Sequence, residues 1–116
     1  MAAQQKNRIM DTLQKYINGV KAVYGAHLKK VILYGSYARG DYTADSDIDI
    51  MILVDLNEIE IRNLRNKLSD ITFDINCEND VLIMPIVQNE AFFEKWVRAL
   101  PFYNNVNNEG IELYVS

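Results

Sequence analysis

Cysteine, clustered basic residues and long apolar runs are all scarce in this sequence, and each absence excludes a class of protein. The single cysteine, Cys77, can form neither an internal disulfide nor a cysteine-rich zinc site. No segment approaches the roughly 18–20 consecutive apolar residues of a membrane span. The polar start, from Met1 to Asp11, holds no apolar segment long enough for a signal peptide. We therefore expect a soluble, cytoplasmic protein with no membrane partner.

The charge balance is acidic. Sixteen Asp and Glu against twelve Lys and Arg give a net charge of −4 at pH 7. A surface that binds duplex nucleic acid broadly needs clustered Lys and Arg. Such binding is therefore not expected.

The remaining composition is that of an ordinary globular chain. The 116 residues are 49% hydrophobic and 24% charged, which excludes disorder. Repeats and linkers are absent, so we predict a single domain over residues 1–116.

Hydrophobic periodicity predicts an α/β sandwich with a small mixed sheet packed by helices. We expect helices over residues 4–24, from Asn57, as its cap, to about residue 70 or a little beyond, and over 89–100. We expect strands over residues 31–34, 48–54 and 81–87, with a loop over 35–46. Pro85 lacks an N–H group, which indicates that the last strand lies at a sheet edge or is bulged. Gly25 is a plausible end for the first helix. The tail, residues 102–116, predicts only a helical turn over 103–106.

Two acidic residues at the start of the second strand carry the first chemical signal. Asp47 and Asp49 are two positions apart, so a strand directs both carboxylates to the same face. Carboxylates that close repel each other unless a cation lies between them. Hard oxygen ligands suit Mg²⁺ or Mn²⁺, and Mg²⁺ completes its shell with water and substrate phosphates. An Asp-x-Asp sequence alone is more often an ordinary solvated strand start.

A glycine-serine turn supplies the second signal. Gly35 and Ser36 end the preceding strand, where a glycine lets backbone N–H groups approach a phosphate. Ser36 adds a hydroxyl group and Arg39 a forked cation. Gly-Ser alone is usually only a turn. A metal pair opposite a phosphate site, in contrast, is the arrangement needed for nucleotidyl transfer.

The spacing resembles a known family signature. Gly35-Ser36, ten intervening residues and then Asp47-Ile48-Asp49 resemble the polymerase-β-like nucleotidyltransferases. The fuller string Gly-Ser-Tyr-Ala-Arg-Gly, with Ser46 before the first acid, is similar to the minimal nucleotidyltransferases. The C-terminal part of this sequence, over residues 100–103 and 109–113, also resembles the C-terminus of that family. The resemblance thus covers nearly the whole chain.

This resemblance implies a polymerase-β-like fold and a role for each matching residue. Gly35 and Ser36 would contact the phosphates of a nucleoside triphosphate such as ATP. Arg39 and Ser46 would complete that nucleotide site. Asp47 and Asp49 would be catalytic and hold Mg²⁺ or Mn²⁺.

The third carboxylate of the family is where this sequence departs. The family places it in the next strand, whose centre here carries Met84, and a methionine can neither ligate a hard metal nor act as a base. Asp80 lies at the predicted entrance of that strand, where alternation would put it on the same face as Leu82 and Met84. Asp80 is therefore the candidate third catalytic acid. The alternative is that it has no chemical role and only begins the strand or caps the preceding loop.

Three functions remain open from the sequence. The first is transfer of AMP from ATP to an acceptor hydroxyl. The resemblance implies that a HEPN-type toxin partner bears it and that this chain is the antitoxin. The second is a nucleotide-binding module that neutralises its partner by contact alone. The third is an aminoglycoside-type nucleotidyltransferase. A protein partner predicts an exposed apolar patch, with Tyr103, Ile111 and Tyr114 as candidates. Homo-oligomerisation stays open.

Overall fold

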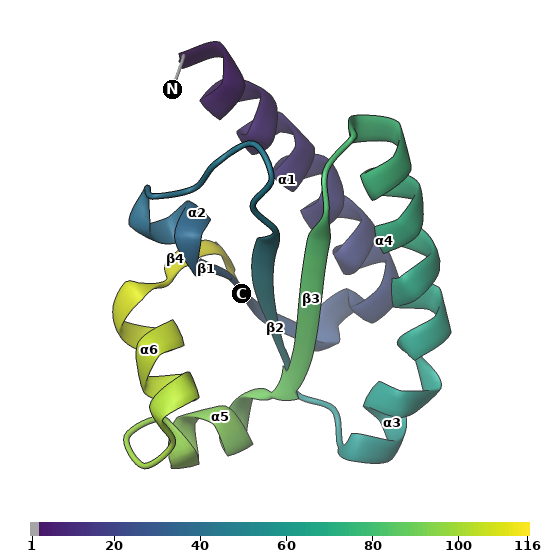
Figure 1. Ribbon diagram of the computed structural model, residues 1–116. Helices are drawn as coiled ribbons and strands as arrows, with labels where there is room; N and C mark the ends of the chain where they lie inside the picture. Colours follow the sequence, from purple (N-terminus) through teal and green to yellow (C-terminus); the bar gives the residue numbers. More distant parts are fainter. Residues whose placement is uncertain (1–2) are drawn as a thin grey trace.

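The computed structural model describes residues 3–116 as a four-stranded sheet with helices on both faces (Figure 1). The helices and strands, in chain order, are α1 (Ala3–Tyr24), the 3-10 turn η1 (Gly25–His27), β1 (Leu28–Tyr34), α2 (Ser36–Arg39), β2 (Ile48–Val54), α3 (Glu58–Asn63), α4 (Arg65–Asn79), β3 (Ile83–Asn89), α5 (Glu90–Trp96), α6 (Pro101–Glu109) and β4 (Ile111–Val115).

The sheet is mixed, in the order β3-β2-β1-β4. β1 pairs antiparallel with both β2 and β4, and β2 pairs parallel with β3. The parallel pair needs a long crossover, which α3 and α4 supply. β3 is an edge strand that carries Pro85, as the sequence predicted. The α/β fold class is confirmed.

Both faces of the sheet are covered, which is why β2 is an almost unbroken apolar run. Ile48, Ile50, Ile52 and Val54 point toward α1 and α4, which lie side by side in Figure 1. Met51 and Leu53 point the other way and pack with residues of α5 and α6. Asp49 shares this second face by alternation. We call it the Asp49 face of the sheet.

The first helix and the second strand confirm the sequence predictions closely. α1 ends at Tyr24, and Gly25 follows with φ +57°. β2 spans Ile48–Val54 as predicted. Asn57 caps α3 through a capping box with Glu60.

Several segments differ from the sequence predictions. The predicted helix from Asn57 is divided at Leu64 into α3 and α4 and extends to Asn79. α5 ends at Trp96, short of the predicted residue 100. The tail forms the full helix α6 and the strand β4. β4 has only a weak pattern of its own, and it forms because β1 offers an unpaired edge.

Among the described helices, none combines the length and apolarity needed to cross a membrane.

Candidate functional site

Gly35 forms the turn that brings the main chain against Asp49. Its backbone has φ +74° and ψ −153°, a conformation open essentially only to glycine. A Cβ atom built on Gly35 would overlap Oδ2 of Asp49. β1 and β2 are paired here, with Tyr34 opposite Asp49, so the sheet itself fixes the approach. The predicted glycine turn and acidic strand therefore meet in space.

Ser36 begins the short helix α2 directly after this turn. Its carbonyl accepts from the N–H groups of Gly40 and Asp41. The N–H groups of Ser36 and Tyr37 have no backbone acceptor in the described part of the chain. First-turn N–H groups of this kind are free to bind an anionic oxygen.

Asp47 and Asp49 lie close enough to affect each other electrostatically. Asp47 is exposed just before β2, and Asp49 is half-buried within it. The pKa of Asp49 is raised above its ordinary value, first by burial and then by the charge of Asp47, while Arg39 acts in the opposite direction. A bound divalent cation would remove the repulsion that raises this pKa. The donor set thus fits a hard cation such as Mg²⁺.

Arg39 links the glycine-serine turn to α6. Its Nη1 donates to Oε2 of Glu109 at 3.2 Å, and its Nε donates to Oδ2 of Asp41 at 3.3 Å. No sequence pattern indicated Glu109 as a partner, because the two residues are 70 positions apart. Arg39 also lines a cavity of 250 Å³ with Gly35 and Tyr34. Its phosphate role stays a prediction.

Ser46 shapes the turn that precedes Asp47. Its Oγ accepts from the N–H of Thr43 at 2.9 Å, and its own N–H donates to the Thr43 carbonyl at 3.1 Å. These two bonds hold the chain in a turn immediately before β2. A nucleotide contact from Ser46 stays a prediction.

Asp80 does not lie at the entrance of a strand, so that prediction was wrong. β3 begins at Ile83, and Asp80 ends α4 with φ +51°. Strand alternation therefore does not reach Asp80. The residue in register with Asp49 on β3 is Met84. Within residues 3–116 no group of three or more His, Cys, Asp or Glu side chains could hold a metal ion.

Asp80 nevertheless lies close to the acidic strand start. A cavity of 390 Å³ is lined by Ser46, Asp47 and Asp80 together with Arg8 and Tyr37. Sequence reasoning missed Arg8. This residue reaches the cavity from α1 only through tertiary packing, because it is far in sequence from Asp47 and Asp80.

The two tyrosines that flank the loop pack on each other. Tyr37 and Tyr42 stack with ring centroids 4.2 Å apart and planes within 10°. The stacked pair packs the two ends of the 36–42 segment against each other.

The comparisons with known proteins agree with this geometry. The model of the family described as "Polymerase beta, Nucleotidyltransferase" matches residues 7–105. A relative in Methanocaldococcus jannaschii, named as a protein adenylyltransferase, is 39% identical over 102 residues, which cover 88% of this chain and 94% of the relative. A second relative of the same organism and activity name is 31% identical over 105 residues, covering 90% and 98%.

Solved structures share the fold at low sequence identity. A nucleotidyltransferase from Sulfolobus solfataricus aligns with a TM-score of 0.54 at 20% identity, covering 93% of this chain and 86% of that one. A toxin–antitoxin complex crystallised with AMP-PNP aligns with a TM-score of 0.52 at 20% identity, covering 87% and 72%.

Proposed function

We propose that this chain, which belongs to the polymerase β nucleotidyltransferase family, transfers AMP from ATP to a hydroxyl group of a protein acceptor. Family membership makes the chain a nucleotidyltransferase. The identities of the nucleotide and of the acceptor are what we propose. The observation that carries it is the contact between the Gly35 turn and the Asp49 carboxylate, because it joins a phosphate-binding turn to a metal-binding strand in one place.

Each step of the transfer has a group for it in this chain. The free N–H groups of Ser36 and Tyr37 bind and orient the triphosphate. Asp47 and Asp49 would hold Mg²⁺, which when bound neutralises phosphate charge. The acceptor oxygen forms a bond to the α-phosphorus, the bond from that phosphorus to the bridging oxygen breaks, and pyrophosphate leaves. The hydroxyl proton passes to the carboxylate of Asp80.

The acceptor is proposed to be a HEPN-type toxin, with this chain as its antitoxin. The naming of the relatives as protein adenylyltransferases supports a protein acceptor. A structural neighbour that is a toxin–antitoxin complex is consistent with the pairing.

Calorimetry and a labelling assay test this proposal. ATP with Mg²⁺ is titrated into the wild type and into the double variant Asp47→Ala/Asp49→Ala. Labelled ATP is then added to the wild type together with a HEPN-type protein as the proposed acceptor. Metal-dependent binding that the double variant loses, with label on the partner, is the expected result. A wild type without metal-dependent ATP binding would contradict the nucleotide site itself.

Replacing Asp80 by asparagine is expected to lower transfer about 100-fold, the usual contribution of a general base. Binding of ATP with Mg²⁺ should stay within about twofold of the wild type, because Asp80 lies at the end of α4 and not on β2. Single-turnover transfer and calorimetry measure the two effects. Asp74→Asn, an exposed change on the same helix, is the matched control. Unchanged transfer in Asp80→Asn would remove Asp80 from the mechanism.

One observation favours a second candidate function. Met84, which cannot take a proton, lies in register with Asp49, where a third carboxylate would complete the acidic group. The chain could therefore neutralise a partner by contact without transferring a nucleotide. An Asp49→Ala variant that still neutralises the partner supports this contact function, whereas one that no longer neutralises it supports the transferase.

A further inference from the structure

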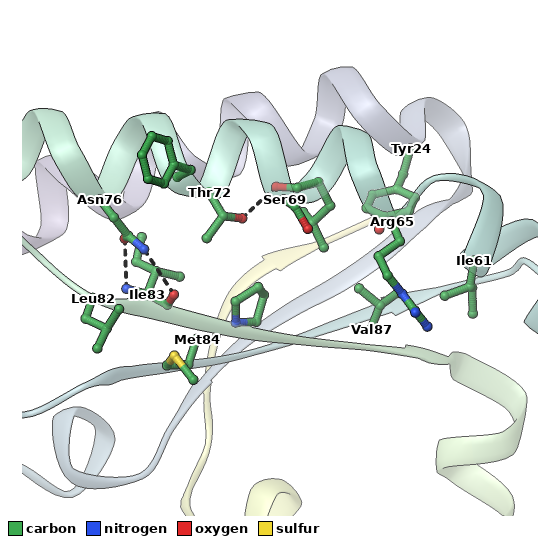
Figure 2. A pocket seen from close by; sticks show the side chains of 13 residues that line it. Tyr24, Ile61, Arg65, Ser69, Thr72, Asn76, Leu82, Ile83, Met84 and Val87 are labelled. Atoms are coloured by element: carbon green, nitrogen blue, oxygen red, sulfur yellow. Dashed lines mark hydrogen bonds between the residues drawn. The ribbon is translucent and has the colours of Figure 1, made fainter.

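A groove runs between α4 and the outer edge of β3, away from the glycine-serine turn. Its main cavity has a volume of 530 Å³, and Figure 2 shows α4 on one side and β3 on the other. A second cavity of 460 Å³ adjoins it, because the two share Ile61, Arg65 and Val87. Together they follow β3 from Leu82 to Asn89. The groove is thus elongated along a strand edge.

The lining of this groove is largely apolar and open to solvent. Phe73 on α4 is 68% exposed, Leu82 just before β3 is 50% exposed and Met84 within β3 is 47% exposed. Large apolar side chains at this level of exposure on one groove indicate a surface that a partner covers.

The outer edge of β3 has free backbone groups for pairing with another strand only toward its C-terminal end. Ile48 donates to the Leu82 carbonyl, so in a parallel pair the odd-numbered residues of β3 direct their backbone groups outward. The Asn76 side chain bonds both the N–H and the C=O of Ile83. Pro85 has no N–H group. Val87 therefore offers the free outward donor and acceptor within the described strand.

Two polar side chains in the groove have no partner in residues 7–116. Tyr24 is only 2% exposed, yet its hydroxyl has no hydrogen-bond partner. Burial raises the pKa of Tyr24 to about 12, so the phenol remains an O–H donor. Figure 2 shows Tyr24 reaching from α1 into the space beside Arg65. Arg65 makes no ion pair with the described side chains. The Tyr24 hydroxyl is a buried donor closed off from solvent, whereas Arg65 is an exposed cation in an otherwise largely apolar groove, where an acidic side chain would complement its charge.

The groove leads to the acidic site. Leu82 lines both the main cavity of the groove and the cavity that holds Asp47 and Asp80. Met84 lines the groove and is in register with Asp49, and neighbouring strands lie about 4.8 Å apart. A chain in the groove would bring a side chain at its Leu82 end to the carboxylates.

We propose that this groove binds an extended segment of the acceptor protein, whose acidic side chain pairs with Arg65 and whose hydroxyl reaches the Asp47–Asp49 site. The inference rests on the proposed function and adds where and how the acceptor binds. Apolar side chains of the bound segment cover Phe73 and Leu82, and the backbone of the segment bonds to the backbone of Val87. Arg65 acts as a positioning residue for the acceptor and does not touch ATP.

Steady-state transfer to the HEPN-type partner tests the groove. Arg65→Glu reverses the charge at an exposed position in the groove. Lys67→Glu is the matched control, because it is an exposed charge reversal on α4 outside the groove. We expect Arg65→Glu to raise the KM for the acceptor at least tenfold and Lys67→Glu to leave it unchanged. The KM for ATP should not change in any variant.

Thermal unfolding separates positioning from structural damage. Arg65→Glu should keep the Tm of the wild type while it weakens acceptor use, a combination that a merely structural role would not produce. If Arg65→Glu matches Lys67→Glu in acceptor KM, the groove is not the acceptor site and the inference is wrong. If light scattering shows a wild-type dimer that Arg65→Glu dissociates, the groove belongs to a second copy, which also overturns it. A wild type that labels no partner overturns the proposed function and this inference together.

Discussion

Replacing Asp49 by asparagine is expected to abolish nucleotidyl transfer and to make the folded chain more stable at neutral pH. Transfer should fall by about 1,000-fold or more, because a lost metal ligand removes several kcal/mol of charge stabilisation and each 1.36 kcal/mol is tenfold in rate. Asparagine has the same shape as aspartate, so it should fit against Gly35.

The stability gain follows from the direction of the Asp49 pKa shift. Burial and the Asp47 charge raise the pKa of Asp49 in the folded chain above its ordinary value of 3.8. The unfolded chain therefore ionises first as pH rises, and the folded state loses stability between pH 3.8 and the higher folded pKa. The asparagine side chain of the Asp49→Asn variant stays neutral at every pH. The variant should thus have the higher Tm at pH 7 and the same Tm as the wild type near pH 3.

Thermal unfolding with and without Mg²⁺ completes this test. Added Mg²⁺ should raise the Tm of the wild type, since it binds the folded state, and should leave the asparagine variant unchanged. Asp70→Asn, on the exposed surface of α4, is the control and should shift neither Tm nor transfer. A variant at position 49 that keeps a tenth of wild-type transfer would refute the metal-ligand role.

Replacing Gly35 by alanine should damage both the fold and the reaction. The backbone at Gly35 has a conformation essentially reserved for glycine, which costs about 1–3 kcal/mol for another residue. The added methyl group would also overlap Oδ2 of Asp49. The turn and the carboxylate must then separate. We expect a loss of about 2–4 kcal/mol in the free energy of unfolding and transfer reduced at least 100-fold.

Gly25→Ala isolates the backbone cost from the steric one. Gly25 also has a positive φ, +57°, but a Cβ atom there would meet nothing within 4 Å. This control should lose about 1–2 kcal/mol and keep full transfer. Urea unfolding and single-turnover transfer measure both variants. Equal losses of stability and of transfer in the two variants would mean that the Gly35–Asp49 contact does not matter.

The second strand and the two motifs could be predicted from sequence because their signals are local. An apolar run bounded by acids determined β2 over its full length, residues 48–54. The Gly35-Ser36 and Asp47-x-Asp49 spacing indicated a nucleotidyltransferase, and the family match confirms that class. The Asn57 cap was readable for the same reason, because a capping box acts within four residues.

The prediction that Asp80 begins a strand was wrong, because the alternation of apolar residues does not reveal where a helix ends. α4 extends to Asn79, and Asp80 takes the left-handed conformation that ends the helix. The helix continues because its Leu68 side packs against α1 and the sheet, a tertiary gain that outweighs the weak local pattern.

The candidate partner residues of the tail were only partly placed from sequence. Ile111 is exposed at 46%, but Tyr103 packs with the Met51 and Phe93 cluster and Tyr114 packs on the opposite core beneath Lys21. Aromatic residues in an amphipathic pattern look alike whether they face the core or a partner. The exposed apolar groove at β3 is formed by residues far apart in the chain, and no pattern marks it.

The sequence by itself determined the residue types of the site, the order of most elements and the acidic, globular character of the chain. These depend on composition and short-range spacing. Only the tertiary structure decided that Gly35 lies against Asp49, that Met84 is the neighbour of Asp49 in the sheet, and that the Tyr24 hydroxyl is left unpaired beside Arg65. The reason is that strand pairing and helix docking bring together residues whose separation along the chain carries no energetic signal.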